Sequence, residues 1–209
     1  MSVVTIGDNT GDTYAGSIDA HFKENNPTNP FGGTTALEVH KYGVGDHAHV
    51  AIQFSGLSNI VGPVTVSAAT LYLWYVPAIG ATPTVSAFRL LRNWVESEVT
   101  WNIYSSGNNW GTAGGLGSGT DRVGSATGSG ALGSSAQYYS ITGLAADVEA
   151  WINGTANNYG WHLERTDGAN DATYIVLEAS EGTDGHRPYL EVNFTAGAAG
   201  NPNYYYAQM

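Results

Sequence analysis

Two tryptophans and a glutamate stand close together in a polar stretch, "WVESEVTWN", at Trp94, Glu96 and Trp101. Indole rings offer apolar faces, and a carboxylate accepts hydrogen bonds from hydroxyl groups, so this trio could form a sugar-binding cleft. The alternative is that both tryptophans belong to a core and that Glu96 bonds a buried loop. We favour this alternative, because buried tryptophan is typical of sandwich cores.

A catalytic interpretation of the same stretch would use Glu96 and Glu98 as a glycosidase pair. Such a pair needs two carboxylates about 5 to 10 Å apart across a cleft, and two neighbouring acids are little support for that. The sequence contains no P-loop, H-E-x-x-H or G-x-S-x-G motif. We therefore expect that the protein is not an enzyme.

Histidines and acidic loops suggest two kinds of metal site. His47 and His49 stand at i and i+2, and His40 or Asp46 could supply a third ligand. We favour a polar strand face instead, because no third ligand stands at a defined spacing. We expect no cofactor, but a structural calcium stays open, although no acidic loop has the EF-hand spacing. Its candidate ligands are Asp167, Asn170, Asp171 and Asp184.

Charge limits the kinds of partner. The 209 residues include seven Lys plus Arg, and the formal net charge is −11. Nucleic acid and alginate-like polyanions are disfavoured, because binding them needs clustered cations. Cysteine is absent, which excludes disulfides and thiolate sites. The start lacks the features of a secretory signal, and no stretch has the ~20 apolar residues that cross a bilayer, so we expect no membrane partner.

Apolar and polar residues alternate in many short segments. In "AHVAIQF", Val50, Ile52 and Phe54 point to one side. The segment 65–76 is apolar on both faces near its end, which indicates a central strand or contact with a partner. These patterns predict an all-β fold, a single jelly-roll-like antiparallel β-sandwich. Further alternating segments are 85–92, 173–179 and 189–194, and the expected buried residues include Trp101, Leu73, Ile52, Phe54, Trp151 and Val192.

One segment has the helical period instead. In "TGLAADVEAWING", residues 142–154, Leu144, Val148 and Trp151 recur at i, i+4 and i+7. Thr142 could be the N-cap and Gly154 the C′ residue. We expect one short helix that closes an end of the sandwich.

The sandwich domain is expected to span residues 1–195, with a Gly- and Ser-rich excursion over 104–140 and a C-terminal tail over 196–209. A structureless loop of that length inside a compact domain is uncommon. Two interpretations stay open: a long excursion with one weak strand near 121–125, or a flexible insertion at one end of the sandwich.

Several landmarks occur in order along the chain: "DTY" at 12–14, "NPTNPFGG" at 26–33, "ATLYLW" at 69–74, "WVESEVTWN" at 94–102 and "SEGTDGHRPYLEVNF" at 180–194. In these landmarks the chain resembles the DNRLRE-type β-sandwich domains, which include a class of carbohydrate-binding modules. The resemblance implies a jelly-roll-like sandwich. It also implies that a charged pair found in relatives is absent here, because His49 and Ser55 stand where Arg and Asp are usual.

Two functions from different classes follow. The first is a virion structural protein, a capsid decoration or cement protein of a tailed phage, made in the host cytoplasm. It rests on a family domain that fills the chain and on the missing export signal. The alternative is a free-standing carbohydrate-binding module or adhesin domain. Neutral glycans would then stack on Trp74, Trp110 or Trp161.

The tail carries its own prediction. Three consecutive tyrosines cannot all face one surface of a strand, so Tyr204, Tyr205, Tyr206 and Met209 are expected to dock on a neighbour. That neighbour would be the major capsid protein or another copy in a homotrimer. The alternative is that the tail folds back on its own sandwich.

Overall fold

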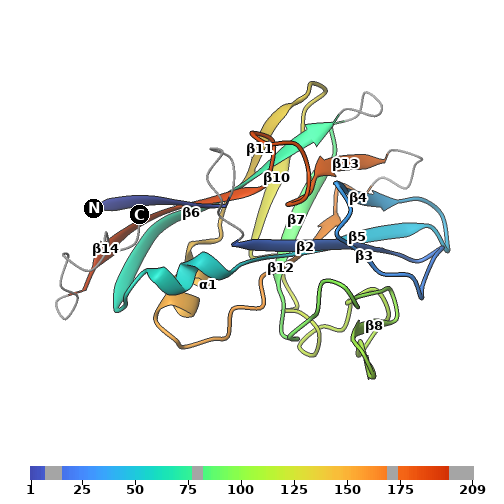
Figure 1. The fold of residues 1–209 in the computed structure, drawn as a ribbon, viewed down its shortest axis with the longest axis horizontal. Helices are drawn as coiled ribbons and strands as arrows, with labels where there is room; N and C mark the ends of the chain where they lie inside the picture. Colours follow the sequence, from blue (N-terminus) through green and yellow to red (C-terminus); the bar gives the residue numbers. More distant parts are fainter. Residues whose placement is uncertain (8–15, 77–81, 169–173, 198–209) are drawn as a thin grey trace.

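The computed structural model describes residues 1–7, 16–76, 82–168 and 174–197, and it is an antiparallel β-sandwich with one α-helix (Figure 1). This confirms the expected all-β fold class. Its elements are β1 (Ser2–Gly7), β2 (Ser17–Lys23), β3 (Phe31–Gly32), β4 (Ala36–Lys41), β5 (His47–Phe54), the 3₁₀ turn η1 (Ser55–Asn59), β6 (Val64–Val76), β7 (Thr84–Arg89), β8 (Ile103–Ser105), β9 (Asn108–Asn109), β10 (Gly128–Ala131), β11 (Gln137–Ile141), α1 (Ala145–Ile152), β12 (Trp161–Arg165), β13 (Ile175–Glu178) and β14 (Tyr189–Ala196).

The strands form two layers that share β4. In the first layer, called sheet A here, β14 lies between β1 and β6, and β13 joins β6 to β4, while β11 pairs with the other edge of β6. In the second layer, sheet B, the order is β3-β2-β5-β12-β7-β10. Because β4 pairs with both β13 and β5, the two layers are continuous through this strand.

The core between the layers forms from the inward positions of alternating strands. Leu71, Leu73 and Tyr75 of β6 are fully buried and face Trp161 and Leu163 of β12. The six residues expected to be buried are all at most 8% exposed, which confirms that prediction. The alternation therefore fixes which side chains of β6 point outward.

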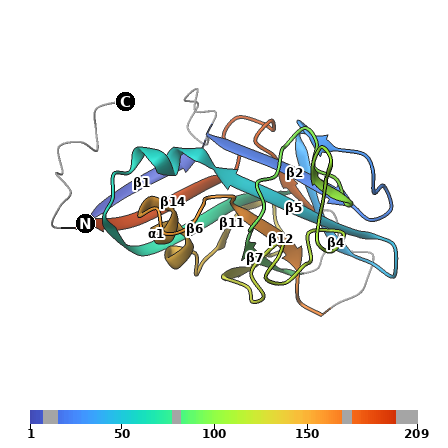
Figure 2. The same ribbon diagram turned by 90° about the horizontal axis from the view of Figure 1, so that it is seen from below.

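The helix α1 covers one end of the sandwich beside β6 (Figure 2). Trp151 packs on Trp161 with ring centroids 4.6 Å apart. The expected N-cap was wrong: Leu144 occupies that position, because the backbone of Thr142 pairs with Ser129. Gly154 has φ +69° just past the helix, as a C′ glycine should.

The Gly- and Ser-rich segment is built into the sandwich. It contributes β10 to the edge of sheet B and β11 to the edge of sheet A. The weak strand near 121–125, which one of the two interpretations included, does not form; Arg122 makes only isolated bridges. Instead the carboxylate of Asp121 is fully buried and accepts hydrogen bonds from the amides of Gly111, Thr112 and Gly117, at 2.7 to 2.9 Å. One carboxylate thus holds a polar loop together.

Candidate functional site

The outer face of sheet A carries a group of aromatic side chains. Since Leu71, Leu73 and Tyr75 point inward, Tyr72 and Trp74 of β6 point outward. Tyr72 pairs with Tyr189 of β14, and their rings stack at 4.5 Å. Trp74 pairs with Tyr138 of β11, and their rings meet edge to face at 5.1 Å. All four rings are half-buried.

The loop between β13 and β14 folds onto these rings. His186 stacks on Trp74 at 3.7 Å, with the two ring planes 9° apart. The Tyr138 hydroxyl lies 2.9 Å from the Gly185 carbonyl and 3.0 Å from that of Arg187. Burial raises the pKa of Tyr138 to about 12, so its proton stays available for these carbonyls at neutral pH. Below, the aromatic cluster means Tyr72, Trp74, Tyr138, His186 and Tyr189.

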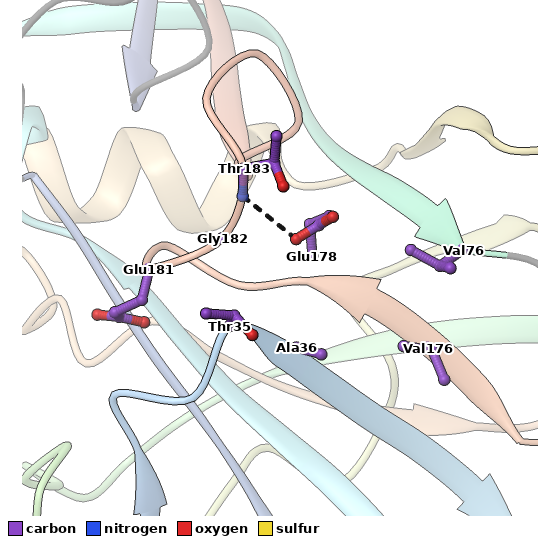
Figure 3. Close-up of a pocket in the computed structure, with 8 residues that line it drawn as sticks. All are labelled: Thr35, Ala36, Val76, Val176, Glu178, Glu181, Gly182 and Thr183. Carbon is purple, nitrogen blue, oxygen red and sulfur yellow. Dashed lines mark hydrogen bonds between the residues drawn. The ribbon is translucent and has the colours of Figure 1, made fainter.

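A pocket of about 510 Å³ adjoins this cluster along β6 and β13. Figure 3 shows the residues that line it. Val76 and Val176, which pair across β6 and β13, form its apolar wall. In the same register Glu178 comes level with Trp74, so the pocket continues the cluster along the sheet. The full lining is Thr35, Ala36, Val76, Val176, Glu178, Glu181, Gly182 and Thr183.

Glycine is needed where the loop crosses Glu178. A Cβ on Gly182 would lie 2.9 Å from the backbone carbonyl oxygen of Ala179, which cannot easily move, and would also meet one carboxylate oxygen of Glu178. The Thr183 amide approaches the same oxygen at 3.4 Å, a weak hydrogen bond that leaves this carboxylate able to accept others.

Two acidic residues line the pocket, and a third lies next to one of them. Glu178 and Glu181 line it, and Asp19 of β2 lies behind Glu181, where Asp19 Oδ2 accepts the Ser180 amide at 2.9 Å. Asp19 is only 1% exposed, and its pKa lies well above the usual value because of burial and then of repulsion from Glu181. Burial likewise raises the pKa of Glu96, which accepts the Asp19 amide at 3.1 Å.

A half-exposed aromatic cluster beside a pocket that offers hydrogen-bond acceptors suits a sugar, and the family comparison agrees. Residues 11–194 match the model of carbohydrate-binding module family 96. The chain belongs to this family. The comparison with curated proteins finds no match. The family 96 match supports the carbohydrate-binding part of the resemblance found in the sequence, and a binding domain rather than a catalytic one.

Two of the three tryptophans expected to stack on glycans are buried in the family 96 domain. Trp161 is fully buried between the sheets and donates to Asp147 at 3.0 Å. Trp110 is 5% exposed and donates to the Thr100 carbonyl at 2.9 Å. Neither ring offers a face to a sugar in this structure, because both are packed on all sides. Trp74 alone of the three lies on the aromatic cluster.

The possible cleft around Trp94 and Trp101 is a core, as the favoured alternative held. Both tryptophans pack with Phe22 on the outer face of sheet B. Glu96 bonds the Asp19 amide, and Glu98 bonds the Ser106 amide at 2.7 Å. Each carboxylate thus serves a backbone amide of its own fold, with no arrangement that suits a glycosidase pair.

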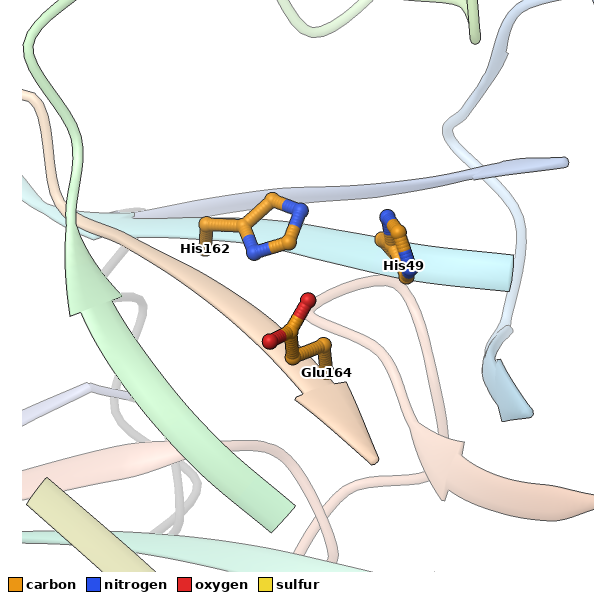
Figure 4. Close-up of side chains that lie close together, drawn as sticks. All are labelled: His49, His162 and Glu164. Atoms are coloured by element: carbon orange, nitrogen blue, oxygen red, sulfur yellow. The ribbon is translucent and has the colours of Figure 1, made fainter. Parts of the chain in front are cut away.

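His49, His162 and Glu164 place three ligand atoms within 4.8 Å of one another (Figure 4). Both imidazoles contact the Gly114 carbonyl at 3.0 Å, and Arg122 Nη1 lies 3.2 Å from His162 Nδ1. Burial lowers the pKa of His49 to about 3 and that of His162 well below its usual value. The histidines are therefore neutral donors to one carbonyl.

The guanidinium of Arg122 already engages two of the three candidate ligands, His162 and Glu164. It bonds Glu164 at 3.1 Å and lies 3.8 Å from the ring centroid of Phe88. A positive group already neutralises Glu164 and faces the free nitrogen of His162. We interpret the trio as a structural hydrogen-bond network rather than a metal centre.

The other proposed metal ligands do not converge in the described residues. His40 bonds Asp46 at 3.0 Å, whereas His47 contacts Glu24 at 3.3 Å and the Gly43 carbonyl. Asp167 pairs with Arg165, and Asp184 with Arg187. The remaining calcium candidates, Asn170 and Asp171, lie outside the described residues, as do the tail residues Tyr204, Tyr205, Tyr206 and Met209.

Sequence reasoning missed most of the candidate site. Tyr138, His186 and Tyr189 stand far from Trp74 in sequence and meet it only through strand pairing and the loop before β14. The signal present in the sequence was the apolar character of both faces of residues 65–76 near their end.

In the part of the chain that the structure describes, no helix is long and apolar enough to span a membrane.

Proposed function

We propose that the chain binds glycans through the aromatic cluster and the adjoining pocket on the outer face of sheet A. The observation that carries this proposal is the position of half-exposed Trp74 next to a pocket lined by two valines and two glutamates. Sugar rings have apolar C–H faces that pack on aromatic and aliphatic groups, while their hydroxyls donate to carboxylates.

The shape of the cluster favours binding of the end of a glycan chain, or of a short glycan segment, over binding of a flat polysaccharide surface. Two ring pairs are stacked face to face: Tyr72 with Tyr189, and Trp74 with His186. In each pair, one ring therefore covers part of the face of the other. Ring edges and hydroxyls remain for a ligand, and the pocket supplies the concave surface. A sugar residue in the pocket would contact Val76 and Val176 while its neighbours in the glycan reach the cluster.

The test is titration calorimetry with a panel of neutral, amino and acidic oligosaccharides. For a ligand that binds, Trp74→Ala should weaken affinity at least about tenfold, which is ~1.4 kcal/mol. The matched control is Tyr42→Ala, which removes an exposed aromatic side chain from a different surface. Equal affinity of the Trp74 variant and the native protein, with both folded by circular dichroism, would place the site elsewhere.

A role in a virion is a separate proposal that rests on the sequence alone. The family match supports the carbohydrate-binding alternative instead. Contact with a major capsid protein, a homotrimer and a virion location would each need their own test. Deleting residues 201–209 and measuring assembly with virion proteins is the direct one.

A further inference from the structure

The pocket beside the aromatic cluster has an uneven charge that bears on which glycan it accepts. Its lining includes the carboxylates of Glu178 and Glu181 and contains no Lys, Arg or His. The remaining side chains are two valines, two threonines and an alanine. Figure 3 shows the Glu178 side chain beside the apolar wall and that of Glu181 directed away from it, so a ligand in the pocket meets the carboxylate of Glu178 and no positive group from the lining.

The lysine and arginine side chains of the protein do not line the pocket. Six of its seven Lys and Arg form ion pairs with carboxylates outside the pocket, and the seventh, Lys41, is exposed at the opposite end of β4 from Ala36. The nearest arginine in sequence, Arg187, bonds Asp184 at 2.8 Å and the Gly182 carbonyl at 3.1 Å. The six pairs are Lys23–Glu38, Arg89–Asp147, Arg92–Asp121, Arg122–Glu164, Arg165–Asp167 and Arg187–Asp184.

A third carboxyl group, that of Asp19, lies next to Glu181 outside the pocket lining. Behind Glu181, the carboxyl of Asp19 is 1% exposed, and its Oδ1 atom is buried without a hydrogen-bond partner in the structure. Its other oxygen is bonded to Ser180, the residue before Glu181. The Ser180 hydroxyl in turn donates to Glu181 at 3.0 Å. Burial raises the pKa of Asp19, and the nearby charge of Glu181 raises it further, so the two carboxyl groups are electrostatically coupled.

We infer that this pocket selects glycans that carry a free, protonated amino group, such as de-N-acetylated hexosamine chains. The inference rests on the proposed function and names the ligand class of the same site. The ammonium would donate a charge-assisted hydrogen bond to Glu178, with Glu181 adding negative charge at the edge of the pocket, and the sugar's C–H face would pack on Val76 and Val176. An N-acetyl group removes that charge, and a carboxylate-bearing glycan meets repulsion.

The experiment compares three hexasaccharides of equal linkage: fully de-N-acetylated chitohexaose, N-acetylated chitohexaose and cellohexaose. Calorimetry near pH 6, where the sugar amine is charged, should give at least about tenfold tighter binding of the de-N-acetylated form. Raising the salt concentration should shrink this preference, because screening weakens the attraction between partly exposed charges.

Variants separate the pocket from the general negative charge of −11. In Glu178→Gln/Glu181→Gln, the affinity ratio of de-N-acetylated to N-acetylated chitohexaose should fall toward one. The control Glu191→Gln/Glu24→Gln makes the same change in net charge away from the pocket lining and leaves the Lys23–Glu38 pair intact, and should keep the ratio. An equal loss in both double variants, or a ratio that survives in the pocket variant, overturns the inference.

The outcomes distinguish this inference from the proposed function. If cellohexaose and both chitohexaoses bind equally and Trp74→Ala weakens all three, the site stands and the amino-group selectivity is wrong. If a broad glycan panel shows no binding that depends on Trp74, the proposed function itself fails. Retained native circular dichroism is required of every variant.

Discussion

The two outer faces of the sandwich both carry aromatic and histidine side chains, yet within the described residues only the face on sheet A is left partly open. On sheet B, Phe22, Trp101 and Trp110 are buried under the chain's own loops. On sheet A, Trp74 and its neighbours stay half-exposed beside a pocket. The difference teaches that a tryptophan-rich motif marks a binding surface only where no other part of the chain covers it.

The faces also differ in how they treat charge. The covered face keeps His49 and His162 neutral and pairs Arg122 with Glu164, so its charges are balanced internally. The open face leaves Glu178 and Glu181 on a pocket without a cation in its lining. A balanced network suits a structural role, whereas unbalanced carboxylates at a surface suit recognition of a donor.

The largest expected effect is on the covered face. Trp101→Ala should lower the free energy of unfolding by about 3 to 5 kcal/mol, because it empties a site that is 6% exposed. The matched truncation on the open face, Trp74→Ala, should cost no more than half as much. Urea denaturation of both variants measures the contrast, and similar losses would mean that the two faces are not distinct.

The next largest expected effect concerns Asp121, which holds the Gly-rich loop over the outer face of sheet B. Asp121→Ala removes the acceptor for three amides in the loop over sheet B, and we expect a loss of about 3 kcal/mol. Amide hydrogen exchange at Gly111, Thr112 and Gly117 should quicken by more than at the strands of sheet A. Unchanged protection at these amides would show that the loop is held by other contacts.

A pH effect sharpens the electrostatic contrast. The pKa of His49 is about 3 in the folded protein and 6.5 without perturbation, so below pH 6.5 the unfolded chain binds a proton that the folded state refuses. Stability is therefore lost as pH falls from 6.5 toward 3. From pH 7 to 5.5 the loss from His49 should be about 1.3 kcal/mol.

His49→Gln, whose amide can still donate to the Gly114 carbonyl, should remove this part of the pH dependence. Asp19 has a raised pKa and acts with the opposite sign, since its contribution is lost as pH rises above 3.8. It is common to both proteins, so it cancels in the comparison. Denaturation at several pH values with parallel curves for the two proteins would contradict the assigned pKa shift.

The smallest effect is on the open face. Tyr138→Phe removes a hydroxyl that bonds the carbonyls of Gly185 and Arg187, and should cost about 1 kcal/mol. Because these bonds hold the loop that carries His186 against Trp74, exchange of the His186 amide should quicken. Protection as in the native protein would mean that the ring stack, rather than Tyr138, fixes the loop.

The sequence determined the fold class and the core through its period of two. Val50, Ile52 and Phe54 alternate in β5 as expected and are buried, and the helical spacing of Leu144, Val148 and Trp151 located α1. These are local patterns, since a strand or a helix sorts its own side chains between two faces. The position of the Gly154 turn followed from the same local reasoning.

Tertiary structure decided which aromatic residues are available to a ligand. Trp74 and Trp161 both stand in apolar strands, but one points out of sheet A and the other into the core, because each strand's register and its neighbours set its inward face. The Gly-rich segment covers sheet B because Asp121 gathers amides from residues up to ten positions away. Three residues reach the Trp74 region only through tertiary structure. Tyr138 and Tyr189 arrive when β11 and β14 pair with β6, and His186 arrives with the loop before β14. The solvent exposure of an aromatic side chain depends on contacts between segments far apart in the sequence. The spacing of residues within one segment does not predict those contacts.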